Sequence, residues 1–396
     1  MDIKTTKILL ELVKASIWGN DSKVEGTTIN EDVYEELEKQ AIAVLPIPII
    51  PKLSIPSEIN ATWKKAIFKH LTFNCNYRYI QSILPLQVPY VILKGIAAAQ
   101  YYPYPEYRAM GDIDIITKRE DYLEACSMML KDGFQEIEGN HEDERGRHRS
   151  FVKNGITIEI HRFFSLLNNA EQAKYLDDLI IQSITPTHLL PDKVNGLVIL
   201  EHISQHLENG LGLRQIIDWM MFVEKCIPDE NWFEYAKLTE RIGLKTLAIV
   251  TTRMCEIYLG LTEHNWCKEA DIGLCKQLMD YVLCSGNFGN KRTSDSDIVK
   301  NVLVIARNPK AAFQLFQTRG LLNWKAAQKY YVLRPFAWLF QIWRYFFRGI
   351  NRNKASSKLK LEFKTAQERN KMLEKLGVRQ ASKGQTYYKN GEYVKQ

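Results

Sequence analysis

Several features are missing from the sequence, and each absence excludes a class of protein. No two of the seven cysteines have Cys-x-x-Cys spacing, so no common zinc motif is present. A chain of 396 residues can bury a large core without disulfides, and we expect reduced thiols, as in a cytoplasmic protein. No run of about eighteen apolar residues occurs, and Glu11 and Lys14 interrupt the first apolar segment, so neither a spanning helix nor a secretory signal is expected. Internal repeats and low-complexity tracts are also absent.

Positive charge is concentrated near the C-terminus. The net charge is +7, with 45% hydrophobic and 25% charged residues, which is typical of a globular protein. Residues 319–379 hold roughly fifteen lysines and arginines against three glutamates, so the rest of the chain is mildly acidic. No nucleic-acid recognition module accompanies the basic region, and nucleic acid is not an expected partner.

Hydrophobic spacing predicts a helical start, a central set of strands and further helices. Helices are expected over residues 5–18, 30–43 and 56–81, with an extended proline-rich segment between the last two. The middle of the chain predicts strands at 88–93, 112–117, 134–138, 149–153 and 156–161, with short helices at 97–102 and 120–131. Asn154-Gly155 predicts a two-residue hairpin turn. Five more helices are expected at 192–206, 213–225, 232–243, 244–259 and 272–284, followed by a polar loop over 286–296.

These patterns predict an α+β fold with four parts. Residues 1–85 form an N-terminal helical region packed on the core, and residues 86–165 form a small mixed-sheet domain with flanking helices. An all-α domain follows over residues 166–300. Residues 301–396 form a basic, aromatic-rich helical region.

Asp112 and Asp114 are the most informative residues for function. Because they are two apart on a predicted strand, their carboxylates project to the same face. Like charges this close need a cation, and Mg²⁺ prefers carboxylate and phosphate oxygens. Glu159 lies in an otherwise apolar predicted strand, where an unpaired carboxylate is costly, and supplies a third ligand. Lys94, Arg108 and the turn at Gly95 add phosphate-binding groups nearby. The alternative is that the aspartates form only a solvated strand edge.

Five segments carry a family resemblance. Leu93-Lys94-Gly95, Arg108, Gly111-Asp112-Ile113-Asp114, Gly133-Phe134 and Glu159-Ile160-His161 resemble the uncharacterised nucleotidyltransferase family of the DNA polymerase β-like superfamily. The resemblance covers residues 60–225 and continues through His202, His206, Arg214 and Ile217-Asp218-Trp219. It implies a bacterial protein, sometimes of surface-polysaccharide gene neighbourhoods, that transfers a nucleoside monophosphate from a nucleoside triphosphate to a hydroxyl acceptor and releases pyrophosphate.

The resemblance also implies roles for single residues. Asp112, Asp114 and Glu159 would be catalytic and hold Mg²⁺, with Mn²⁺ as the alternative ion. The nucleotide phosphates would contact Lys94, Gly95, Arg108, Gly111 and His161. His202, His206 and Arg214 would face the acceptor. Three departures stand out: Lys94-Gly95 replaces the usual Gly-Ser, the spacing from Gly95 to Asp112 is longer than in the commonest form, and the third carboxylate is Glu instead of Asp.

The histidines and Arg214 have plainer interpretations as well. His161 can be a buried structural histidine. His202 and His206, spaced i and i+4, can be core residues or a zinc pair, although no third zinc ligand is evident. Arg214 and Asp218 have the spacing of a helix salt bridge.

The segment Tyr330–Ile350 combines a wide aromatic face with a narrow polar stripe. The stripe consists of Arg334, Gln341, Arg344 and Arg348, and more basic residues follow. This composition is typical of an interfacial helix that would place the protein peripherally at the inner face of an anionic membrane. A helix packed on the helical domain is the alternative. A nucleic-acid surface is a third interpretation, although no recognition module supports it.

Two other functions remain open from the sequence. The chain can be a non-catalytic binding or scaffold protein that retains the fold. It can also be a nucleotidyltransferase of the toxin–antitoxin type.

Overall fold

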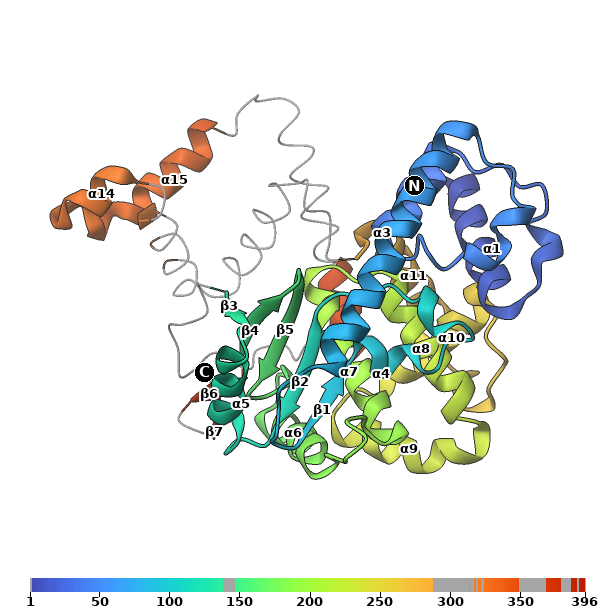
Figure 1. Ribbon diagram of the computed structural model, residues 1–396. Coiled ribbons are helices and arrows are strands. Elements are labelled where there is room, and N and C mark those ends of the chain that lie inside the picture. Colours follow the sequence, from blue (N-terminus) through green and yellow to red (C-terminus); the bar gives the residue numbers. More distant parts are fainter. Residues whose placement is uncertain are drawn as a thin grey trace. The chain divides into compact units, whose positions relative to one another are not determined.

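The computed structural model describes residues 2–137, 147–287, 313, 317, 320–321, 324–348, 368–378, 386–389 and 392–395. The chain divides into two compact units (Figure 1). One unit spans Met1–Gly289 with Leu373–Gln396, and the other spans Asn290–Met372. The boundaries 1–85, 86–165, 166–300 and 301–396 remain predictions.

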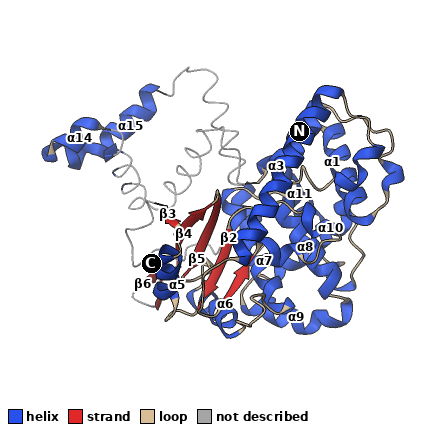
Figure 2. Cartoon of the chain, viewed as in Figure 1, coloured by secondary structure: helices blue, strands red, loops and turns tan. Residues whose placement is uncertain are grey.

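A five-stranded mixed sheet is the centre of the larger unit (Figure 2). Its strands are β1 (Tyr90–Leu93), β2 (Ile113–Thr117), β3 (Gln135–Glu136), β4 (His148–Lys153) and β5 (Ile156–His161). The spatial order is β1-β2-β5-β4-β3, and only β2 and β5 pair in parallel. This sheet confirms the predicted strands. At the β4–β5 turn, Asn154 and Gly155 have φ angles of 51° and 74°, as a tight hairpin turn requires.

One face of the sheet is the apolar core. Ile113 and Ile115 of β2 and Ile158 and Ile160 of β5 pack there against α3 and α5. Because strand side chains alternate, residues 112, 114, 159 and 161 project to the opposite face. The alternation in the sequence thus separates the core from the candidate site.

Helices surround the sheet and confirm most of the predicted ones. The helices are α1 (Ile3–Trp18), α2 (Glu31–Lys39), α3 (Ser57–Ser82), α4 (Gly95–Ala99), α5 (Tyr122–Lys131), α6 (Ala170–Gln182), α7 (Asp192–Asn209), α8 (Leu213–Cys226), α9 (Asp229–Arg241), α10 (Lys245–Leu259) and α11 (Ile272–Ser285). Asn30 caps α2, since its Oδ1 accepts the Val33 N–H at 3.0 Å. An α/β fold with a mixed sheet is therefore present, while a separate all-α domain remains a prediction.

Three parts of the chain differ from the expectation. The proline-rich segment contains the 3₁₀ helix η2 (Ile47–Lys52), so the extended conformation was wrong. The φ of proline suits a 3₁₀ turn as well as an extended chain. Helix α6 was not predicted. Strands β6 (Thr386–Lys389) and β7 (Glu392–Lys395) form a hairpin in a region expected to be wholly helical. Short 3₁₀ helices also occur: η1 (Asp21–Lys23), η3 (Pro105–Tyr107) and η4 (Asn265–Cys267).

The second unit contains α14 (Lys325–Lys329), η5 (Tyr331–Phe336) and α15 (Ala337–Arg348). Gln341 is buried while Leu339 and Trp343 are exposed, so Gln341 does not belong to an exposed polar stripe as predicted. The side chains of Arg344 and Arg348, and Ile350 as a whole, lie outside the described residues, as does most of the loop predicted over 286–296. Within the described part of the chain, no helix combines the length and apolarity needed to cross a membrane.

Candidate functional site

Three carboxylates converge because of how β2 and β5 pair. Asp112 directly precedes β2, and Asp114 lies within it. Parallel pairing sets Asp114 beside Glu159 of β5. One ligand oxygen from each of Asp112, Asp114 and Glu159 lies within 4.8 Å of the other two. The predicted three-carboxylate cluster is therefore present as a geometric group.

Asp114 is the buried centre of this group. Its Oδ1 accepts a hydrogen bond from Lys94 Nζ at 2.7 Å and lies 2.8 Å from His161 Nε2. Burial by itself would raise the pKa of Asp114, but Lys94 and His161 together hold that pKa well below its usual range. Asp114 is thus ionised in the folded protein.

The other two carboxylates have different electrostatic surroundings. Asp112 is the exposed member, yet the protein around it partly removes water, and this desolvation together with the Asp114 charge raises its pKa to about 6. Burial opposes ionisation of half-buried Glu159, but the neighbouring His161 imidazole, 3.5 Å away, lowers the pKa of Glu159 below the usual value. Asp112 is therefore the one carboxylate of the cluster whose pKa is raised.

The turn between β1 and α4 positions Lys94 beside Asp114. Lys94 has φ 53° and ψ −142°, a conformation that side chains rarely adopt, and Gly95 follows with φ 38°. A Cβ on Gly95 would meet the Tyr77 hydroxyl at 2.4 Å. Only glycine therefore fits this position, which brings backbone close to the carboxylates.

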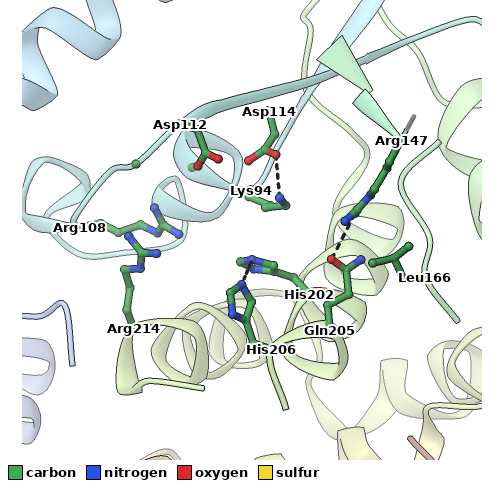
Figure 3. Close-up of a pocket in the computed structure, with 12 residues that line it drawn as sticks. Lys94, Arg108, Asp112, Asp114, Arg147, Leu166, His202, Gln205, His206 and Arg214 are labelled. Atoms are coloured by element: carbon green, nitrogen blue, oxygen red, sulfur yellow. Dashed lines mark hydrogen bonds and ion pairs between the residues drawn. The ribbon is translucent and has the colours of Figure 1, made fainter. Parts of the chain in front are cut away.

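A pocket of about 270 Å³ lies between the face of the sheet that carries the aspartates and helices α7 and α8. Figure 3 shows the aspartates on one side and His202, Gln205 and His206 on the other. Its lining comprises Lys94, Gly95, Arg108, Gly111, Asp112, Asp114, Arg147, Leu166, His202, Gln205, His206 and Arg214. Glu159 and His161 are not part of this lining.

His202 and His206 form a neutral hydrogen-bonded pair. His206 Nδ1 lies 3.3 Å from the Gly210 carbonyl oxygen, so it carries the proton and leaves Nε2 as an acceptor. His202 Nε2 then donates to His206 Nε2 at 2.9 Å. Burial and nearby cations lower the pKa of His202 well below its usual value and that of His206 to about 4. The pocket therefore has a neutral imidazole wall opposite its carboxylates.

Two arginines contribute to the pocket wall. Arg108 Nε and Nη2 each donate to Asp218 at 2.7 Å, and Tyr102 donates to the same carboxylate at 2.8 Å. Asp218 thus pairs with Arg108, which is distant in the sequence. This pair accounts for the buried Asp218 carboxylate without the helix salt bridge to Arg214 that the spacing suggested. Arg214 donates to the Ala109 carbonyl at 3.1 Å, which fixes the chain just before the aspartates.

Several pocket residues were not predicted from the sequence. Arg147 donates to the Phe164 carbonyl and to Gln205 Oε1, and Leu166 lies beside them in the lining. His148 lies opposite His161 in the β4–β5 ladder. The one available signal was that His148 directly precedes the strand predicted over 149–153, which the Asn154-Gly155 turn pairs with β5.

Two buried carboxylates hold the loop after β5. Asp177 of α6 accepts the Phe164 and Ser165 N–H groups at 3.0 Å, and Glu201 of α7 accepts the Leu166 N–H at 2.8 Å. Burial raises the pKa of Asp177 to about 6 and that of Glu201 to about 7. These contacts fix the loop that brings Leu166 to the pocket.

Comparison with known proteins gives one match. The model of a family described as "Uncharacterised nucleotidyltransferase" matches residues 32–260. This range contains every residue that lines the pocket and all three carboxylates. No curated protein and no solved structure matches the chain.

Proposed function

Because the chain belongs to an uncharacterised nucleotidyltransferase family, we propose that it transfers a nucleoside monophosphate from a nucleoside triphosphate to a hydroxyl acceptor. Pyrophosphate is the other product. The observation that carries the proposal is the convergence of Asp112, Asp114 and Glu159 within 4.8 Å on the edge of a cationic pocket. We infer an acceptor from surface-polysaccharide metabolism, as the family resemblance implies.

The donor set fits a hard divalent cation. Three carboxylates offer the oxygen ligands that Mg²⁺ prefers, and Mn²⁺ accepts the same ligands. Such ions stabilise the attacking and leaving oxygens of an in-line displacement. Desolvation, followed by the charge of Asp114, raises the pKa of Asp112, and a cation bound at the cluster would oppose both effects.

The chain's own residues supply the remaining functions. Asp112 and Asp114 would hold the divalent cation, which would supply positive charge to the triphosphate. Glu159, ionised by its contact with His161, orients the acceptor hydroxyl. Lys94 and the Gly95 turn stabilise phosphate charge as it develops. Arg108 adds positive charge to the wall, although Asp218 engages its guanidinium.

The opposite wall would receive the acceptor. His202 and His206 are neutral at pH 7 and therefore offer hydrogen bonds without repelling a cation-bound nucleotide. Arg214 lines the same pocket. A pocket of about 270 Å³ is near the lower end for ligand sites, and it suits a triphosphate group better than a whole nucleotide.

Pyrophosphate release tests the proposal. The purified chain is incubated with Mg²⁺ and each of the four ribonucleoside triphosphates, with and without hydroxyl-bearing sugars and sugar phosphates. Release that requires Mg²⁺ and is lost in Asp112→Asn supports the transferase. Nucleotide binding without release would indicate the scaffold function. Growth arrest on expression, abolished by Asp112→Asn, would indicate the toxin-type function.

We also propose peripheral contact with an anionic membrane through Tyr330–Ile350. Tyr331 and Val332 are each 78% exposed, and Trp343 is 55% exposed. Exposed aromatic side chains followed by an excess of lysine and arginine are typical of interfacial segments. This contact would bring the enzyme to a lipid-linked acceptor at the cytoplasmic side.

A further inference from the structure

His148, Glu159 and His161 form a second cluster of metal-binding side chains next to the three carboxylates. Antiparallel pairing sets His148 of β4 opposite His161 of β5, and Glu159 precedes His161 by two residues. All three side chains therefore project from the same face of the sheet. One ligand atom from each lies within 4.8 Å of the other two.

The spacing of these atoms fits a shared metal ion better than direct hydrogen bonds. His148 Nε2 lies 3.4 Å from Glu159 Oε1, and His161 Nε2 lies 3.5 Å from Glu159 Oε2. His161 Nε2 also lies 2.8 Å from Asp114 Oδ1, and this hydrogen bond would be replaced when the imidazole binds the ion. Good hydrogen bonds to carboxylates are roughly 2.7–3.2 Å long. Two ligand atoms that each lie about 2.0–2.1 Å from a tetrahedral zinc ion are about 3.3 Å apart. The cluster thus has the separations of ligands around one ion.

The ligand types select the kind of ion. Two imidazoles and one carboxylate are typical of zinc, cobalt, iron and manganese sites, whereas Mg²⁺ prefers oxygen ligands. His148 is 26% exposed and Glu159 is 20% exposed, while His161 is buried. A cation can therefore reach the cluster from solvent, and coordination positions remain open.

We propose that His148, Glu159 and His161 bind one transition-metal ion, separate from the Mg²⁺ held by Asp112 and Asp114. Glu159 belongs to both groups of ligands, and the contact between His161 and Asp114 also joins them. This inference goes beyond the proposed function, since it assigns the chain a metal that the transfer reaction does not require.

The histidine pair that lines the pocket, His202 and His206, provides a contrast to this cluster. His202 Nε2 and His206 Nε2 lie 2.9 Å apart, a hydrogen-bond distance that is short for two ligands of one ion. Among the residues that the structure describes, no third ligand groups with them. His206→Gln, in the neighbouring pocket, is therefore a matched histidine control.

Cobalt titration tests the proposal on the full-length chain after removal of bound metal with a chelator. Co²⁺ binding is followed by visible d–d absorption and by calorimetry, and Zn²⁺ by competition. The carboxylate site can also take Co²⁺, so the titration is done in a large excess of Mg²⁺. We then expect one tight equivalent of Co²⁺ per wild-type chain, with a spectrum free of thiolate charge-transfer bands. His148→Gln should weaken binding at least about tenfold, because even loss of an outer-sphere partner costs this much. His206→Gln and Asp112→Asn should bind Co²⁺ as wild type.

The opposite pattern would overturn the inference. Absence of saturable Co²⁺ binding, unchanged binding in His148→Gln, or loss in His206→Gln or Asp112→Asn alone would each contradict it. Circular dichroism of His148→Gln establishes that the variant is folded. Mg²⁺-dependent nucleotide binding should survive His148→Gln and fail in Asp112→Asn, so failure of one site is distinguishable from failure of the other.

Discussion

Asp112 and Asp114 are two residues apart and share a face of the sheet, yet they contribute oppositely to stability. Asp114 is buried and paired with Lys94 and His161, whereas desolvation and the charge of Asp114 raise the pKa of Asp112 to about 6. Asp114→Asn should lower the free energy of unfolding by about 3 kcal/mol, because it leaves two partners without their carboxylate. Asp112→Asn should leave stability unchanged or raise it at pH 7, where wild-type Asp112 is ionised at a cost. Urea unfolding measures both.

Both substitutions should abolish Mg²⁺-dependent nucleotide binding, because each removes a ligand of the same ion. Calorimetric titration with a non-hydrolysable triphosphate measures this. If Asp112→Asn destabilises the protein as strongly as Asp114→Asn while binding persists, the two residues are structural and the metal assignment is wrong.

Glu159 differs from the aspartates because His161 keeps it ionised. Glu159→Gln keeps the side-chain volume but removes the charge. We expect turnover to fall at least about a hundredfold, while the affinity for triphosphate and Mg²⁺ changes little because Asp112 and Asp114 remain. Single-turnover kinetics beside equilibrium binding separate the two effects. Wild-type turnover in this variant would leave only the two aspartates as the catalytic group.

At the scale of secondary-structure elements, helices α6 and α7 bring the carboxylates of Asp177 and Glu201 to the loop after β5. Glu201 of α7 is buried and its pKa is raised from 4.5 to about 7. Between about pH 4.5 and 7 the folded state therefore binds a proton that the unfolded state has lost, so this residue's contribution to stability falls as pH rises through that window. Glu201→Gln removes the cost and should raise stability at pH 8 by about 1–3 kcal/mol, with little gain at pH 5.

The buried histidines of the pocket oppose this trend. The pKa of His206 is lowered from 6.5 to about 4, so the contribution of this residue to folding stability rises with pH through that range. The difference between wild type and Glu201→Gln isolates the glutamate. Urea unfolding at pH 5, 6, 7 and 8 gives that difference, with exposed Glu234→Gln as the control. An equal change at every pH would show that the Glu201 charge is not the cause.

The sequence could predict elements and local faces but not contacts between distant elements. Alternation around Asp112 and Asp114 predicted their shared face, and the i, i+2 spacing of Glu159 and His161 predicted theirs. Their convergence depends on the parallel register of β2 and β5, which no local pattern encodes. The Arg108–Asp218 pair joins residues 110 apart in the chain, and Asp218 instead had the local spacing of a partner for Arg214.

Helix α6 was missed for a related reason. Its buried face includes Asp177 between Ala173 and Ile180, so the apolar pattern is interrupted by a charge. That carboxylate is buried because it accepts two backbone N–H groups of the loop after β5. Because the Asp177 carboxylate binds the loop, it interrupts the apolar spacing by which the helix could have been predicted.

At the scale of the whole molecule, membrane contact depends on the second compact unit. Liposome co-sedimentation should detect the chain with anionic vesicles and not with neutral ones. Truncation after Asn323 should abolish binding, and higher salt should weaken it, because basic residues each contribute on the order of 1 kcal/mol. Trp343→Ser tests the exposed aromatic contribution without truncation. Equal recovery in the supernatant with anionic and neutral vesicles at low salt would refute the contact.

The central claim is that the carboxylate cluster binds the triphosphate through divalent cations and positions it for nucleotidyl transfer. A crystal structure with Mg²⁺ and a non-hydrolysable nucleoside triphosphate tests it most directly. We expect Mg²⁺ bound to Asp112, Asp114 and Glu159, the phosphates beside Lys94 and Gly95, and free space toward His202 and His206 for an acceptor. A nucleotide bound elsewhere, or bound here with Lys94 still paired to Asp114 and no cation between the carboxylates, would contradict the account.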